Sequence, residues 1–217
     1  MGPITGDAAT GSALLLVAAA LFVLYAACLL LRPHSRRRAA LPATALARWP
    51  GEAHTASLRD IRYLERLVSD ERSAEPMPFR VSDVVVRTVA ARRAAGLRVD
   101  VFSRDGEAEG VAEDLATVLD NLLLNAERHG QGRGVQVESA RAGDFVEIVV
   151  RDLGPGVPEP VRSQLFQPGS PSGGAPGTGL GLHISRNLLR EHGGDLLLRE
   201  TSLGAAFVAR IPAQRRA

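Results

Sequence analysis

Cysteine, lysine and aromatic residues are scarce or absent in this chain of 217 residues. Its single cysteine, Cys28, excludes an intramolecular disulfide and a cysteine-based zinc site. No lysine occurs, so all 26 basic residues are arginines, which we interpret as the codon bias of a GC-rich genome. Aromatic residues make up only 4% of the chain and do not alternate with basic residues, so nucleic-acid binding is disfavoured.

One long hydrophobic run stands near the amino terminus, from Ser12 to Leu31. It contains no charged residue and is long enough to cross the hydrocarbon core of a membrane once. Arg32 and three further arginines follow it, whereas Asp7 is the only charged side chain before it. The positive-inside rule therefore predicts an external amino terminus and a cytoplasmic remainder. A cleaved signal peptide is disfavoured, because its basic residues would precede the run.

Apolar residues recur with helical spacing from Val111 to His129. Asn121, Asn125 and Arg128 lie four and three residues apart, as neighbours on an adjoining face of this predicted helix. An amide oxygen is a suitable ligand for magnesium, and a guanidinium matches phosphate oxygens. Capping or plain solvent exposure would explain these three residues equally well, so the helix alone leaves both interpretations open.

Two glycine-rich segments follow this helix. The first, Asp152–Gly156, ends a predicted buried strand that begins at Phe145, and its glycines allow a ligand to approach the backbone. Its carboxylate can accept a hydrogen bond from an exocyclic amine, or it can be a surface group that stabilises its own turn. The second, Gly177–Gly181, follows a flexible loop (168–177) and opens a predicted helix, Leu180–His192, whose first N–H groups can bind an anion.

The order of these segments resembles the catalytic ATP-binding domain of bacterial sensor histidine kinases, in the superfamily shared with gyrase and the Hsp90 chaperones. The matching motifs are the N box (Asp114–His129), the first glycine box (Asp152–Pro158), the start of the F box (Leu165 and Phe166), the second glycine box (Gly177–Leu182) and the closing segments (Glu191–Gly194 and Gly204–Pro212). A chance coincidence of this many ordered motifs is very improbable.

The resemblance implies ATP and Mg²⁺ as ligands. Asn125 is then the magnesium ligand, Asn121 its neighbour at the phosphates, and Arg128 a phosphate-binding cation. Asp152 binds the adenine amine, and His129 stands where the family often has an aromatic residue beside the nucleotide. The remaining ATP-binding positions belong to the two glycine boxes, of which the second would hinge a lid over the triphosphate: Gly154, Gly156, Gly177, Thr178, Gly179, Leu180 and Gly181.

One residue of the N box separates branches of this superfamily. Gyrase-type ATPases and anti-sigma-factor serine kinases resemble one another in carrying Glu four residues before the metal-binding Asn, and this chain carries Asn121 there. An amide cannot take a proton from water, so ATP hydrolysis lacks its general base. This favours the histidine kinase branch over a hydrolase.

The resemblance is incomplete where a phosphoacceptor is expected. A predicted helix over 57–75 resembles the second helix of the family's dimerisation hairpin, but the first helix with its phosphoacceptor motif is missing. His54 is therefore a weak phosphoacceptor candidate. For His183 and His192 we expect positions on a helix surface or at a helix C-cap.

Two departures from the family pattern concern catalysis. No Arg or Lys occurs between Ser163 and Ser185, where the family's lid often carries a basic residue that reaches the γ-phosphate, and the second aromatic residue of the F box is missing after Phe166. Phosphoryl transfer depends on charge neutralisation at the transferred group. We therefore expect ATP binding to be better preserved than catalysis.

The predicted fold is an α/β (α+β) two-layer sandwich over residues 77–213, with a mixed sheet covered by three helices and an ATP lid. Four segments are expected before it: a short extracytoplasmic tail (1–11), a transmembrane helix (12–31), a basic juxtamembrane linker (32–56) and a remnant of the dimerisation helix (57–75).

The expected function is that of a sensor histidine kinase of a two-component system, anchored by a single pass in the bacterial cell membrane with its ATP-binding domain in the cytoplasm. Its expected partners are a response regulator and a second copy or a partner kinase that supplies the acceptor histidine. The alternative is a degenerate ATP-binding regulator that does not phosphorylate, and an ATP hydrolase is the weakest hypothesis.

Overall fold

The computed structural model describes residues 75–104, 106–169 and 179–215, all of which fall in one compact unit. The elements in chain order are β1 (Met77–Arg80), α4 (Val81–Ala94), β2 (Val99–Ser103), β3 (Glu107–Gly110), α5 (Ala112–His129), β4 (Val135–Ala142), β5 (Phe145–Asp152), α6 (Glu159–Arg162), α7 (Gly181–Glu191), β6 (Asp195–Arg199) and β7 (Ala206–Pro212).

Several predicted features lie outside the described residues. They are the tail, the membrane span, the linker, His54, nearly all of the 57–75 helix and the loop from 170 to 178. Within the ranges that the structure does describe, no helix combines the length and the hydropathy needed to span a bilayer.

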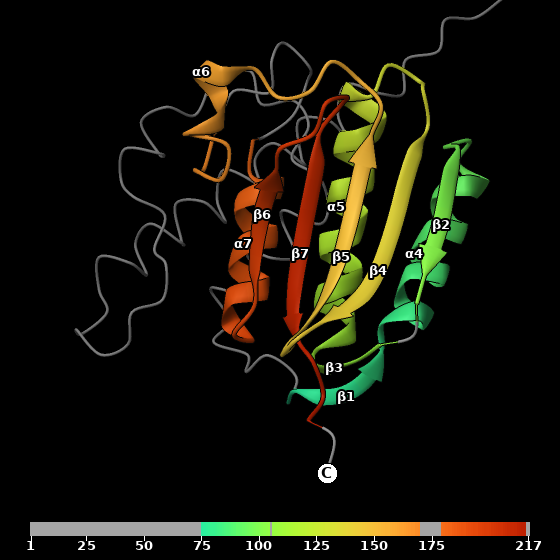
Figure 1. The fold of residues 1–217 in the computed structure, drawn as a ribbon, viewed down its shortest axis with the longest axis vertical. Helices are drawn as coiled ribbons and strands as arrows, with labels where there is room; N and C mark the ends of the chain where they lie inside the picture. Colours follow the sequence, from blue (N-terminus) through green and yellow to red (C-terminus); the bar gives the residue numbers. More distant parts are fainter. Residues whose placement is uncertain (1–74, 105, 170–178, 216–217) are drawn as a thin grey trace, which may run out of the picture. The chain divides into compact units, whose positions relative to one another are not determined.

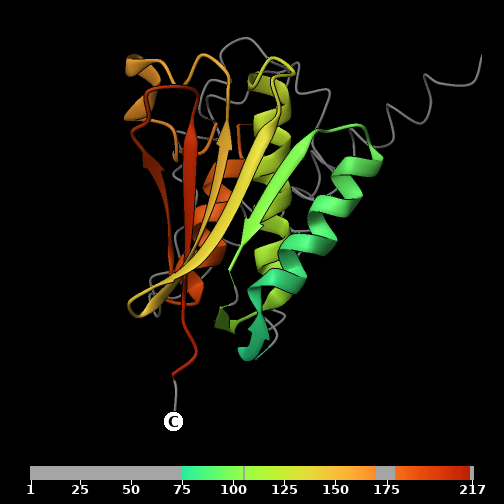
Figure 2. The ribbon, with the colours of Figure 1, turned by 45° about the vertical axis from the view of Figure 1, so that its right-hand side comes forward.

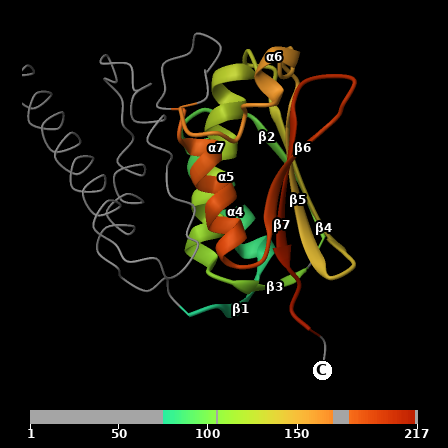
Figure 3. The same cartoon turned by 90° about the vertical axis from the view of Figure 1, so that its left-hand side faces the viewer.

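Five strands form one mixed sheet in the order β2-β4-β5-β7-β6. β2 runs parallel to β4, and the other neighbours are antiparallel. Figure 1 shows α4, α5 and α7 behind this sheet, and Figure 3 shows from the side that all three cover the same face. The predicted two-layer sandwich with a mixed sheet and three covering helices is confirmed.

β1 and β3 form a separate antiparallel pair at the lower end of the sandwich (Figures 1 and 2). An isolated antiparallel bridge between Ala108 of β3 and Ala213 joins this pair to the end of β7. Since β3 leads directly into α5, the small sheet fixes where the N-box helix begins.

The alternation of side chains in β5 explains how one face of the sheet becomes the core. Val146, Ile148 and Val150 are buried, whereas Glu147 and Arg151 on the opposite face are half-buried. Val149 lies on the same face as Glu147 and Arg151 but is buried. Because successive side chains of a strand point to opposite faces, the three apolar residues face the helices. They meet the apolar stripes of α5 and α7, in which each fully buried leucine contributes roughly 1.5–3 kcal/mol. The largest buried side chains there are Leu115, Leu119, Leu122, Leu123 and Leu188.

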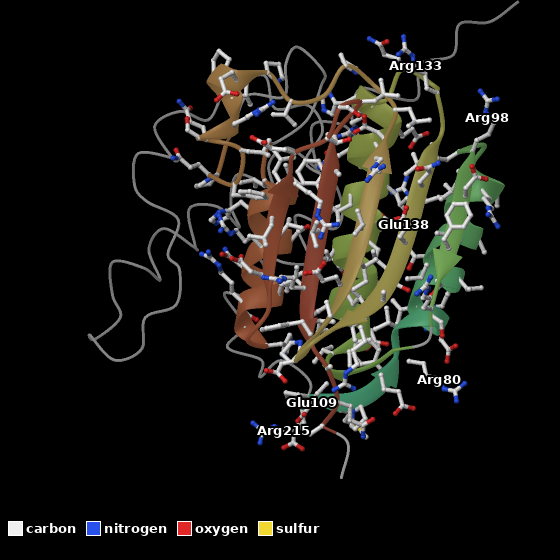
Figure 4. All side chains as sticks on the ribbon, in the orientation of Figure 1. Arg80, Arg98, Glu109, Arg133, Glu138 and Arg215 are labelled. Atoms are coloured by element: carbon white, nitrogen blue, oxygen red, sulfur yellow. The ribbon has the colours of Figure 1, made fainter. Side chains whose placement is uncertain are left out.

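The opposite face of the sheet carries charged side chains. Glu147 of β5 accepts hydrogen bonds from Arg210 of β7 and Arg199 of β6, each over 2.8 Å. Glu138 of β4, labelled in Figure 4, points to the same face by the strand register. The same face also carries a small apolar cluster of Val149, Ala206 and Val208, with Leu197 packed against it. The sequence therefore builds a sheet with one helix-covered face and one face on which charged side chains lie beside a small apolar cluster.

The predicted element boundaries agree closely with the structure. The helix expected over Val111–His129 is Ala112–His129, and the one expected over Leu180–His192 is Gly181–Glu191. Differences of one residue at a helix end fall within normal assignment variation. The strand from Phe145 continues through Asp152, so this carboxylate belongs to the sheet rather than to the turn after it.

The turn between β6 and β7 yields a stability prediction at Gly204. This residue has φ +73°, and a Cβ there would overlap the backbone oxygen of Asp152. Gly143 has a similar φ of +63° but nothing within 4 Å of an added Cβ, so it is a matched control. Gly143→Ala should lower the free energy of unfolding by about 1–2 kcal/mol, from the left-handed backbone alone. Gly204→Ala should lower it by about 1–3 kcal/mol more, because the backbone must also move.

Urea unfolding of both variants measures this difference. Equal losses for the two alanines would show that the contact between Gly204 and Asp152 does not constrain the fold.

Candidate functional site

The predicted site residues come from elements that end or begin at one end of the sandwich. α5 and β5 run toward the upper end in Figure 1, and α7 starts there and runs back. This brings the last turns of α5, the carboxyl end of β5 and the amino end of α7 to one side of the domain. The N box, the first glycine box and the described part of the second (Gly179–Leu182) therefore come to the same end of the domain, although they lie far apart in the sequence.

Asp152 is the buried charged group of this end, with 5% of its surface exposed. Its Oδ1 accepts hydrogen bonds from the backbone N–H groups of Gly154 (2.8 Å) and Ala205 (3.2 Å). A carboxylate is costly to bury without such donors. No residue in the described ranges donates to its second oxygen, Oδ2. The alternative of a surface aspartate is wrong, and Oδ2 is available to a donor from outside the chain.

Glycines hold the first glycine box against the end of α5. A Cβ on Gly154 would lie 2.6 Å from the carbonyl oxygen of His129, and one on Gly130 would lie 3.3 Å from the Cβ of Asp152. Gly156 (φ +83°) similarly lies against Gly204, whose oxygen would be 3.0 Å from an added Cβ. These glycines serve packing within the protein, in addition to the open approach that the sequence predicted.

Asn125 is half-buried on the last full turn of α5, and Arg128 and His129 after it are exposed. Within the described part of the chain, neither the Asn125 amide nor the Arg128 guanidinium has a hydrogen-bond or ion-pair partner. A partly buried amide oxygen without a protein donor suits a hard cation that keeps some of its waters. The predicted magnesium ligand and phosphate-binding cation thus have the exposure that these roles require.

Asn121 differs from its two neighbours on the stripe. It is buried, and its Nδ2 donates to the carbonyl oxygen of Gly181 (3.3 Å) and to the Oγ of Ser185 (3.1 Å). Both amide hydrogens are therefore directed at α7. Any contact of Asn121 with a ligand must come through its oxygen.

A buried hydrogen bond joins the other end of the pair of helices. His192, directly after α7, lies with its Nε2 2.9 Å from Oδ2 of Asp114, in the first turn of α5. Only 7% and 4% of the two side chains are exposed. His192 is the C-cap residue of α7, one of the two positions expected for it. Its side chain does not lie on the surface, because it has a buried acidic partner 78 residues earlier in the chain.

Phe166, at the start of the F box, contacts two residues of α7. The guanidinium of Arg186 lies 4.6 Å from the ring centroid of Phe166. Nδ1 of His183 lies 3.1 Å from the carbonyl oxygen of Phe166, and its Nε2 lies 3.0 Å from the Nδ2 of Asn187. A carbonyl only accepts, so Nδ1 carries the proton and Nε2 accepts from the amide. His183 is thus a neutral, part-buried link rather than a surface residue.

The second glycine box is only partly described. Gly177 and Thr178 lie outside the described residues. Gly179 has φ +65°, Leu180 is buried, and the N–H of Ile184 donates to the oxygen of Leu180 over 2.8 Å.

Three residues that contact Asp152 or Asn121 were not predicted from the sequence: Gly130, Ser185 and Ala205. Ser185 was detectable in principle, because it is a polar residue on the apolar stripe of the helix, one turn after Gly181. Ala205 acts through its backbone N–H, which no sequence pattern distinguishes.

A sandwich in which these three motifs meet at one end defines an ATP-binding domain of the histidine kinase type. The profile of the family described as "Histidine kinase-, DNA gyrase B-, and HSP90-like ATPase" matches residues 110–215, and the chain belongs to this family as a sensor histidine kinase catalytic domain.

Individual relatives agree with this assignment. The sensor-type histidine kinase PrrB of Mycobacterium tuberculosis is 36% identical over 157 residues, which cover 69% of this chain and 35% of PrrB. The alginate biosynthesis sensor protein KinB of Pseudomonas aeruginosa is 38% identical over 101 residues, 44% of this chain and 16% of KinB. The crystal structure of the PrrB ATP-binding domain matches with a TM-score of 0.55 and 30% identity, over 65% of this chain and 99% of that domain. The matches thus span about a third or less of these two sensor proteins.

The link through His183 gives the stability of the domain a pH dependence. Burial lowers the pKa of His183 below its ordinary value of 6.5, and the hydrogen bond to Phe166 only partly offsets this. Below pH 6.5 the unfolded chain binds a proton at this residue that the folded protein does not, so the free energy of unfolding falls as the pH falls. His183→Gln should reduce this loss between pH 6.5 and 5, as measured by urea unfolding at a series of pH values.

Asp195 provides an internal comparison. Burial raises the pKa of Asp195, but hydrogen bonds from Arg186 and Arg190 outweigh it and lower the pKa to about 2. The contribution of Asp195 to the free energy of unfolding is present above pH 3.8 and is lost between pH 3.8 and about 2, well below the pH range in which His183 acts.

If the free energy of unfolding changed with pH equally in the wild type and in His183→Gln between pH 6.5 and 5, the assignment of a neutral His183 would be contradicted.

Proposed function

We propose that this chain is a membrane-anchored sensor histidine kinase that binds Mg·ATP at the upper end of the sandwich and transfers the γ-phosphate to a protein histidine. The observation that carries the proposal is Asp152. One oxygen of this buried carboxylate is satisfied by two backbone N–H groups, and the other is open to a ligand, at the same end as the unpaired amide of Asn125.

The open oxygen of Asp152 selects the base. An ionised carboxylate only accepts hydrogen bonds, so Oδ2 pairs with the 6-amino group of adenine and opposes a 6-oxo group. Because Oδ1 is held by Gly154 and Ala205, the carboxylate cannot rotate to offer a different group. A rigid acceptor of this kind favours adenine over a base with a 6-oxo group, because the 6-oxo group would leave a buried polar atom without a hydrogen bond.

The residues at the phosphate end fit a magnesium-bound triphosphate. Asn125 would ligate the metal through its oxygen, Arg128 would pair with phosphate oxygens, and the first N–H groups of α7 would face anionic charge. Bound Mg²⁺ supplies neutralisation of the phosphate charge.

No general base stands at the position where the hydrolases of the superfamily have one. Asn121 occupies it, and both of its amide hydrogens are used by α7. These residues therefore hold ATP without deprotonating a water molecule, which favours transfer to an outside acceptor over hydrolysis.

The membrane anchor, its orientation and the partners rest on the sequence and the relatives. The apolar run from Ser12 to Leu31, followed by arginines, supports a single pass with the ATP-binding domain in the cytoplasm. Relatives named as sensor proteins and sensor kinases support a response regulator as the partner that receives the phosphate. The acceptor histidine is His54 or belongs to a second chain. The absence of any basic residue between Ser163 and Ser185 supports the alternative, an ATP-binding regulator without transfer activity.

Base recognition is tested with Asp152→Asn. Gly154 and Ala205 donate to one position of this side chain, so the Asn oxygen takes that place and its NH₂ group replaces Oδ2. The variant should bind Mg·ATP at least about 100-fold more weakly than the wild type does. Its affinity for inosine triphosphate, divided by its affinity for ATP, should be at least about tenfold higher than in the wild type. Isothermal calorimetry of both nucleotides measures this, with Glu138→Gln on the polar sheet face as the control. An unchanged preference for ATP in Asp152→Asn would refute the assignment of Asp152 to the base.

Transfer activity is tested with γ-labelled ATP. A kinase acting on its own chain yields acid-labile label on the protein, which is lost in His54→Ala if that residue is the acceptor and is lost in Asn125→Ala in either case. Binding of ATP without label, even with a second chain that carries a phosphoacceptor helix, would favour the regulator. Steady release of free phosphate would favour the hydrolase.

A further inference from the structure

Ser185 is a buried hydroxyl in the middle of the apolar stripe of α7. None of its surface is exposed, and its Oγ lies 3.1 Å from the Nδ2 of Asn121. The same nitrogen lies 3.3 Å from the carbonyl oxygen of Gly181, one helical turn before Ser185. A primary amide has two hydrogens, and each of them has an acceptor on α7.

This arrangement fixes the orientation of the Asn121 amide. Reversing the amide would place its oxygen against the carbonyl of Gly181, so the nitrogen must face α7 and the oxygen must face away. Asn121 is also one turn before Asn125 on α5. The two hydrogen bonds therefore tie the turn that carries the proposed metal ligand to the turn of α7 whose N–H groups face the phosphates.

The two ends of the proposed ATP site have separate supports. The base end depends on Asp152 with Gly154 and Ala205, and among the described residues none of these three is hydrogen-bonded to Ser185. The lower halves of α5 and α7 are joined independently by the hydrogen bond between Asp114 and His192. Loss of the Ser185 hydroxyl should thus disturb the upper, phosphate-facing part of the helix pair without separating the helices.

We propose that Ser185 is a positioning residue for the phosphate end of the site: it acts through Asn121 to hold the start of α7 in register with Asn125. This rests on the proposed function, and it adds a residue that acts on triphosphate affinity while leaving base recognition unchanged. Asn121 accordingly links α5 to α7, and its amide nitrogen does not donate to a phosphate.

The test compares two ligands that share the base. In the full chain, Ser185→Ala should weaken the binding of Mg·ATP about tenfold, the effect of one lost hydrogen bond on an aligned site, and that of adenosine less than about twofold. Equilibrium dialysis with labelled ATP and labelled adenosine measures both constants. Ser139→Ala is the matched control, because Ser139 is also a buried serine with a hydrogen-bonded hydroxyl. Its Oγ lies 2.6 Å from the Oγ of Ser103, between the paired strands β4 and β2.

If Ser185 had a purely structural role, Ser185→Ala would weaken the binding of Mg·ATP and of adenosine by the same factor. Ser139→Ala should alter stability and leave the ratio of Mg·ATP to adenosine affinity unchanged, whereas Ser185→Ala should change this ratio. In an Asn121→Ala background, Ser185→Ala should have no further effect on the ratio, since the partner through which it acts is gone. Should Ser185→Ala not fold, Ser185→Cys keeps the volume with a weaker acceptor and should shift the ratio in the same direction.

Two results would overturn the inference: an unchanged ratio in Ser185→Ala, including an equal loss of affinity for both ligands, or an undiminished effect on the ratio in the Asn121→Ala background. If the wild type bound adenosine and Mg·ATP and the variant matched it, only the role of Ser185 would fail. If the wild type bound neither ligand, the proposed function itself would fail, and the role of Ser185 with it.

Discussion

The buried carboxylate of Asp152 is the constraint on which the upper end of this domain depends. Its Oδ1 requires two N–H donors, which come from the turn after β5 and from the start of β7. Satisfying them brings Gly154 against the end of α5 and Gly204 against the backbone of Asp152, so close that neither position has room for a Cβ. A charge placed at the end of a central strand thereby fixes two turns and the helix end around it, and its second oxygen has no donor among the described residues.

The second constraint is the pairing of α5 with α7. A hydrogen bond between Asp114 and His192 joins the lower ends of the two helices, and the hydrogen bonds of Asn121 join their upper halves. Between these contacts lies an apolar interface of leucines. Because α5 carries Asn125 and α7 follows the second glycine box, these contacts within the protein set the distance between Asn125 and the start of α7.

Much of this architecture could be predicted from the sequence, because it depends on local patterns. The period of apolar residues located α5, and the glycine-rich segment before α7 located that helix, each to within one residue at either end. The ordered motifs identified the family. Contacts between distant residues were not predictable: the hydrogen bonds of Asn121 to α7, the partner of His192 and the link from His183 to Phe166 require the tertiary fold. Asn121 illustrates the difference, since its place in the N box suggested a phosphate contact, whereas its nitrogen is bound to α7. The site residues on α5, β5 and α7 do converge as the resemblance implied.

The most direct measurement is an experimental structure of the chain with Mg²⁺ and a non-hydrolysable ATP analogue. The account predicts that the 6-amino group of adenine lies within hydrogen-bonding distance of Oδ2 of Asp152, that the metal is bound by the oxygen of Asn125, and that the hydrogen bonds of Asn121 to Gly181 and Ser185 persist. A nucleotide bound with its base away from Asp152, or a metal held without Asn125, would contradict it.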